Sequence, residues 1–115
     1  MVSPQLQELV QELKKLSYEK KEKIWKRIAK ELEKPTRRRR EVNISRINRY
    51  TKENDIVIVP GKVLSCGEID HKVTVIAWRF SKKAIEKLKK SGCDVIYLKD
   101  YIKKNPNKKN VKIIG

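Results

Sequence analysis

The chain has 115 residues, a formal net charge of +16 and two cysteines. This length is expected to give one domain, residues 1–115, with a modest core. The longest uninterrupted apolar runs are four residues, which excludes a transmembrane helix, and the N-terminus lacks the apolar stretch of a signal peptide. We therefore expect an intracellular protein whose thiols, Cys66 and Cys93, stay reduced.

The first 33 residues have the pattern of two amphipathic helices. Apolar residues recur at helical spacing from Leu6 to Leu16 and again from Ile24 to Leu32. Ser17 is expected to break the pattern or to cap the second helix, and Pro35 ends that helix because its ring disfavours helical geometry at the preceding residue. A helical N-terminus over 1–33, with the two helices antiparallel, is the prediction.

A strongly basic segment follows. Residues 34–49 contain seven Lys or Arg against one Glu. No apolar residue occurs from Pro35 to Glu41, so residues 34–42 are predicted to form an extended basic arm. Arginine pairs with phosphate through two parallel hydrogen bonds and stacks on exposed bases, which favours RNA binding over a solvated disordered linker. The candidate contacts in this arm are Lys34, Arg37, Arg38, Arg39 and Arg40.

The rest of the chain, residues 43–115, is predicted to form a mixed α/β body. Asn43 is a plausible N-cap for a short helix that carries Ile44, Ile47 and Tyr50 on one side, with Arg46 and Arg49 sharing a face. The segments IVIVP, KVL and VTVIAW then have the composition of short strands, separated by Pro and Gly.

A helix capped by Ser81 should run through Lys90 and stop at Gly92 in a left-handed conformation. A strand over 95–98, one helical turn over 100–104 and a final strand over 111–114 complete the prediction. The fold class is mixed α/β: two N-terminal helices and a basic arm leading into an irregular strand-strand-helix body.

Four further lysines, each beside a predicted turn or element end, join the candidate phosphate contacts; they are Lys62, Lys72, Lys82 and Lys83. The basic stretch 99–112 is either a second arm or a flexible end. Among the aromatic residues, Trp25 and Trp78 are expected in the core. Tyr50 and Tyr101, beside basic residues, could stack on RNA or cover the core edge.

Cys66, Asp70 and His71 form the one set that resembles catalytic chemistry, because a thiol nucleophile needs a base and a group that orients the base. A structural role for them is favoured. Two cysteines 27 positions apart and a single histidine do not make a structural zinc site, and no phosphate-binding glycine loop is present. We expect no catalytic residues, no metal and no cofactor.

The order REVNISRINRYTKENDIVIVPGKVLSCGEIDHKVTV, residues 40–75, and the ending VKIIG closely resemble the archaeal and eukaryotic large-subunit ribosomal protein family called L-eighteen-e. The most specific parts are VNISRINRY, VPGKVL and GEIDHKVTV, and bacterial protein L-fifteen is similar over VPGKVL. Length, basicity and the absence of a long extension make the archaeal form the closer match.

The resemblance implies a protein without catalytic role that binds large-subunit (23S-type) rRNA within the cytoplasmic ribosome, beside neighbouring ribosomal proteins. It places Asn43, Arg46, Asn48 and Arg49 on an RNA-binding helix. Family members often have Gly where this chain has Ser65, which puts the RNA contact of that loop in question.

Two other functions stay open at this point. The first is a DNA-binding regulator in which the N-terminal helices and residues 43–50 imitate a helix-turn-helix unit. The second is a factor that associates with the ribosome without being one of its stoichiometric subunits. Neither a membrane partner nor a small-molecule substrate is expected.

Overall fold

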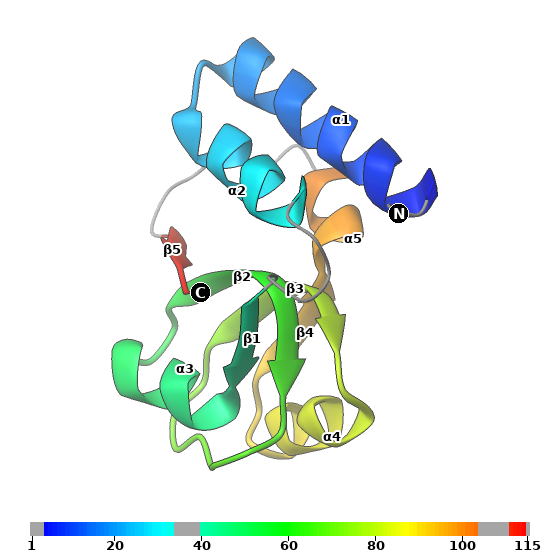
Figure 1. Cartoon of the computed structure of the whole chain (residues 1–115). Helices are drawn as coiled ribbons and strands as arrows, with labels where there is room; N and C mark the ends of the chain where they lie inside the picture. The colour runs from blue at the N-terminus through cyan, green and yellow to red at the C-terminus, as the bar shows by residue number, and fades with distance from the viewer. Residues whose placement is uncertain (1–3, 34–39, 104–110, 115) are drawn as a thin grey trace.

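The computed structural model describes residues 4–33, 40–103 and 111–114. They form five helices and five strands in mixed order (Figure 1). In chain order these are α1 (Pro4–Lys20), α2 (Lys23–Glu33), β1 (Arg40–Asn43), α3 (Ile44–Tyr50), β2 (Ile56–Leu64), β3 (Thr74–Phe80), α4 (Lys82–Lys90), β4 (Asp94–Tyr97), α5 (Leu98–Lys103) and β5 (Val111–Ile113). The mixed α/β class is confirmed.

All the strands pair in parallel, and β2 lies at the centre of the sheet. One edge of β2 pairs with β3, which in turn pairs with β4. The other edge is shared: its first residues, Ile56–Ile58, pair with β5, and its last, Gly61–Leu64, pair with β1. The segment that begins at Arg40 is thereby fixed to the sheet, three residues earlier than the sequence predicted for the body.

The prediction of two short strands, IVIVP and KVL, is wrong, because β2 runs through Pro60 and Gly61 without a turn. The register with β3 shifts between Val59 and Lys62. Proline has no N–H to donate to a ladder and is tolerated in strands at such irregular points. The two residues that look like a turn in the sequence thus mark a bulge within one strand.

Two apolar clusters cover the two faces of the sheet, since successive strand residues point to opposite sides. Val57 and Val59 belong to the body core, which also holds the buried residues of α3 and α4. Ile58 belongs to the hairpin core, which holds the buried residues of α1, α2 and α5. Figure 1 shows the α1–α2 hairpin on one side and α3 and α4 on the other.

The helical hairpin differs from prediction at its turn. Ser17 lies inside α1, which continues to Lys20 and ends where Lys21 adopts a left-handed φ of 54°. The Ser17 hydroxyl donates to the Glu22 carbonyl at 2.8 Å, and the Glu22 N–H donates to the Ser17 carbonyl at 3.2 Å. Ser17 therefore closes the turn from within the helix instead of breaking it.

Several local predictions are confirmed. The Ser81 hydroxyl accepts from the Ala84 N–H at 3.2 Å, and Gly92 ends α4 with a φ of 81°. Trp25 and Trp78 are both buried. Tyr101 is half-buried against the hairpin core, 6.3 Å from Trp25 between ring centroids, and burial raises the pKa of its hydroxyl. Tyr101 thus covers the core edge.

The last strand is held by a charged side-chain contact as well as by its backbone. Asp55 accepts from the Lys52 backbone N–H at 2.7 Å and from the Lys112 ammonium at 3.0 Å. These contacts lower the pKa of Asp55, the Lys52 hydrogen bond contributing most. The ionised carboxylate therefore ties β5 to the turn that precedes β2.

Candidate nucleic-acid interface

The predicted basic arm is described only at its end. Lys34, Arg37, Arg38 and Arg39 lie outside the described residues. The backbone of Arg40 opens β1, in register with Gly61 of β2. The chain therefore leaves the basic segment directly into the sheet, and α3 begins immediately after β1.

Two of the predicted arginines are exposed on α3. Arg46 and Arg49 are three residues apart, so they lie on neighbouring positions of one helix face. The Arg46 guanidinium lies 5.6 Å from the centroid of the Tyr50 ring, within the range of a cation–π contact. The prediction that Tyr50 shares the apolar side of this helix is wrong, because Tyr50 is 54% exposed whereas Ile44 and Ile47 are fully buried. The helix thus offers two cations and a flat aromatic surface to solvent.

The two predicted asparagines make contacts within the protein. The Asn43 Oδ1 accepts from the Cys66 N–H at 3.3 Å, and the Asn48 Oδ1 accepts from the Asp70 N–H at 3.1 Å. Asn43 occupies the N-cap position of α3, but its side chain makes no capping hydrogen bond. The predicted N-cap position is confirmed, but the side-chain oxygen serves the loop after β2 instead of the helix.

The same loop is pressed against the start of α3 at Gly67. The Cys66 carbonyl accepts from the Ser45 N–H at 3.1 Å. Gly67 has a φ of +97°, and a Cβ added there would lie 2.4 Å from the Ser45 Cβ. On the other side, the Gly67 carbonyl accepts from the Lys87 ammonium of α4 at 3.0 Å. The loop therefore bridges the two helices that carry the predicted cations.

Ser65 does not need the freedom of glycine. Left-handed φ values in the described part of the chain occur at Lys21, Asn54, Gly67 and Gly92, and Ser65 is not among them. The conformational requirement of this loop falls on Gly67, two residues later. The backbone at Ser65 therefore gives no reason for glycine to be required at this position.

The predicted lysines of the body are all exposed. Lys62 lies within β2 and not in a turn, in register with Glu41 of β1 and Arg79 of β3. Lys82 and Lys83 are the first two residues of α4. The aliphatic part of Lys72 lies over Gly92, whose added Cβ would come within 3.0 Å of its Cε.

Arg79 is a further exposed cation of the body, which the sequence did not lead us to single out. It is exposed between two buried aromatic residues, and its guanidinium lies 5.3 Å from the Trp78 ring centroid. The register places it beside Lys62 on the next strand. A charged residue that interrupts a hydrophobic strand is the signal that could have identified it.

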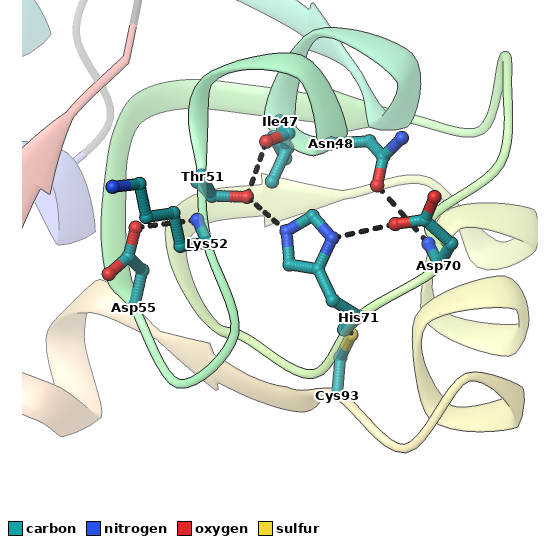
Figure 2. A network of polar contacts seen from close by, with 8 residues as sticks. All are labelled: Ile47, Asn48, Thr51, Lys52, Asp55, Asp70, His71 and Cys93. Atoms are coloured by element: carbon teal, nitrogen blue, oxygen red, sulfur yellow. Dashed lines mark hydrogen bonds and ion pairs between the residues drawn. The ribbon is translucent and has the colours of Figure 1, made fainter.

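The side chain of His71 contacts Asp70 and Thr51 and is not paired with the Cys66 thiol. Its Nδ1 lies 2.8 Å from the Asp70 carboxylate and its Nε2 lies 2.7 Å from the Thr51 hydroxyl, which also donates to the Ile47 carbonyl (Figure 2). The Cys93 thiol donates to the His71 carbonyl at 3.5 Å. The ring therefore fastens the loop to the end of α3, which favours a structural role over a thiol–imidazole pair with Cys66.

The helix-turn-helix alternative does not fit the fold. Ile44 and Ile47 of α3 pack in the body core, whereas α1 and α2 pack in the hairpin core on the other face of the sheet. A helix-turn-helix unit requires two successive helices packed directly on each other. Strand β1 separates α2 from α3, so α3 cannot serve as the second helix of such a unit.

Within 4–33, 40–103 and 111–114, no group of His, Cys, Asp or Glu is arranged to hold a metal ion. Across the same part of the chain, none of the helices is both long enough and apolar enough to span a bilayer. The exposed candidate side chains are instead cationic, and they lie on α3, on strands β2 and β3 at Lys62 and Arg79, and at the start of α4.

Comparison with known proteins points the same way. The family model that describes ribosomal proteins 50S-L15 and 50S-L18e, together with their 60S counterpart, matches residues 5–96. The large ribosomal subunit protein eL18 of Sulfurisphaera tokodaii is 49% identical over 106 residues, which cover 92% of this chain and 90% of the relative. The eL18 protein of Methanothermobacter thermautotrophicus is 45% identical, covering 97% and 93%.

A third eL18 protein, from Sulfolobus acidocaldarius, is 52% identical over 93 residues, 81% of this chain and 75% of the relative. These names denote components of the large ribosomal subunit and not enzymes, so the expectation of a non-catalytic protein is confirmed. The match over most of both chains shows that the protein belongs to the large-subunit ribosomal protein family that includes 50S-L15 and 50S-L18e.

Proposed function

We propose that this chain is a structural constituent of the large ribosomal subunit that binds large-subunit rRNA through its basic arm and the cationic surface next to it. The observation that carries the proposal is that the basic segment continues through β1 into α3, where Arg46 and Arg49 are exposed. Residues 34–49 hold seven of the chain's cations, so the charge is concentrated where the chain crosses from the hairpin to the sheet.

The mechanism is electrostatic and depends on shape. Lysine and arginine neutralise phosphates and release condensed counterions, and such contacts fix orientation without reading base sequence. The loop after β2 supports this surface, because Asn43 and Asn48 hold it against α3 and Lys87 holds it against α4. Since phosphate oxygens only accept hydrogen bonds, a phosphate contact by either asparagine would go through its Nδ2 donors.

The proposed phosphate contacts are the predicted set with Arg79 added. In the arm and α3 they are Lys34, Arg37, Arg38, Arg39, Arg40, Arg46 and Arg49; in the body they are Lys62, Lys72, Arg79, Lys82 and Lys83. Neighbouring ribosomal proteins are further proposed partners, and the cytoplasmic ribosome is the proposed location.

The test is a titration of the full chain against an archaeal large-subunit rRNA transcript over a range of salt concentrations. We expect the logarithm of the binding constant to fall linearly with the logarithm of salt concentration, by roughly 0.7–0.9 for each phosphate contacted. Duplex DNA also offers phosphates and should compete to some degree, but less well than rRNA, whose folded shape and unpaired segments the surface is proposed to fit. Equal displacement by duplex DNA would contradict the proposal.

A further inference from the structure

A shallow hollow lies beside α3, where the end of that helix meets the last strand. It has a volume of about 420 Å³ and is lined by Arg46, Tyr50, Lys112, Ile113 and Ile114. Its lining combines an aromatic ring, two cations and two aliphatic side chains. This is the chemistry of a site that accepts a flat, apolar group attached to an anion.

The aromatic side of the hollow is formed by Tyr50, which is exposed although most large hydrophobic side chains of the described residues are buried. Within the described residues, only Tyr18 and Tyr50 are exposed large hydrophobic residues, whereas Trp25, Trp78 and Phe80 are buried. Tyr50 keeps an exposed ring although the other hydrophobic residues of the same helix are fully buried. The fold therefore leaves this ring out of its core.

Each of the two cations that line the hollow contacts another side chain of the protein. Arg46 lies 5.6 Å from the ring centroid, one helical turn before Tyr50. The Lys112 ammonium is fixed on the other side by the Asp55 carboxylate at 3.0 Å. Both cations already have a partner within the protein, which reduces the side-chain ordering that binding must impose.

We propose that this hollow receives one unstacked nucleobase of the rRNA, which stacks on the Tyr50 ring or the Arg46 guanidinium. The inference rests on the proposed function and adds a base contact to a surface otherwise assigned to phosphates. Arginine and tyrosine both present flat faces that stack on any base, so the site recognises an unpaired nucleotide and not a particular sequence.

The experiment compares Tyr50→Ala, Tyr50→Phe and a matched control, Tyr18→Ala, in the rRNA titration. Loss of a stacked base lowers affinity by roughly 5- to 150-fold, so Tyr50→Ala should fall in this range with an unchanged salt slope. Tyr50→Phe keeps the ring and should bind like the unsubstituted chain. Tyr18, exposed on α1 at the tip of the hairpin, should tolerate alanine.

Ultraviolet cross-linking of the complex, followed by mass spectrometry, gives an independent measurement and should place a nucleotide on the peptide that carries Tyr50. Unchanged affinity for Tyr50→Ala, or cross-links that avoid this peptide, would overturn the inference while leaving the proposed function intact. If the unsubstituted chain did not bind rRNA at all, the proposed function itself would fail. Urea denaturation of each variant separates loss of binding from loss of folding.

Discussion

Replacing Gly67 with alanine is expected to reduce the free energy of unfolding by roughly 3–5 kcal/mol. The backbone there has a φ of +97°, which penalises any residue with a Cβ. The new Cβ would also lie 2.4 Å from the Ser45 Cβ and 2.8 Å from the Ser45 nitrogen. Backbone atoms cannot rotate away, so the loop or α3 must move. Urea denaturation measures the loss.

Gly92→Ala is the matched control for this prediction. Gly92 also has a left-handed φ, of +81°, but the nearest atom to an added Cβ is the Cε of Lys72 at 3.0 Å. A flexible lysine can move, so only the conformational penalty of about 1–2 kcal/mol should remain. Equal losses at Gly67 and Gly92 would show that the contact with Ser45 does not matter.

Replacing Arg37, Arg38, Arg39 and Arg40 with alanine is expected to weaken binding to large-subunit rRNA by roughly a thousandfold at about 0.1 M salt if each contacts a phosphate. The salt slope should fall by about three over the same change, because each lost contact removes its share of counterion release. Folding should be retained, since Arg40 is the first residue of its strand and the other three precede it. The salt-dependent titration supplies both values.

The control removes the same charge elsewhere. Lys14, Lys15, Lys26 and Lys30 are exposed on the helical hairpin, and their replacement with alanine also lowers the net charge of +16 by four. If binding depends on the arm, this variant should lose much less affinity than the arginine variant. Similar losses in both would mean that overall basicity, and not the position of the arginines, drives binding.

The sequence predicted well what depends on neighbouring residues. Ser81 and Gly92 were identified because capping and left-handed stops follow from local chemistry. Trp25 was placed in the core by its position on an apolar helical stripe. These features need no knowledge of distant segments, and the structure has each of them as expected.

What the sequence did not predict depends on contacts between distant segments. Strands β1 and β5 pair with the same edge of β2, although β1 and β5 are more than fifty residues apart in the sequence. No local pattern encodes this arrangement. Pro60 was predicted to separate two strands, because its place in a bulge can be recognised only when the pairing of β2 with β3 is known. The role of Asn43 was missed for the same reason, since its acceptor serves a loop 23 residues away.

The candidate surface was predicted in part. Arg46 and Arg49 were placed correctly on one exposed helix face, because their spacing alone decides it. Arg79 was missed, because its pairing with Lys62 depends on strand register. Tyr50 was left undecided by the sequence, and the structure has it exposed, on the hollow that is proposed to receive a base.

The most direct test of the central claim is sedimentation of the chain with archaeal large ribosomal subunits washed in high salt. A structural constituent should remain with the subunit after the wash, at one copy per particle. A protein that washes off, or that sediments well below one copy per subunit, would be an associated factor and would contradict the account.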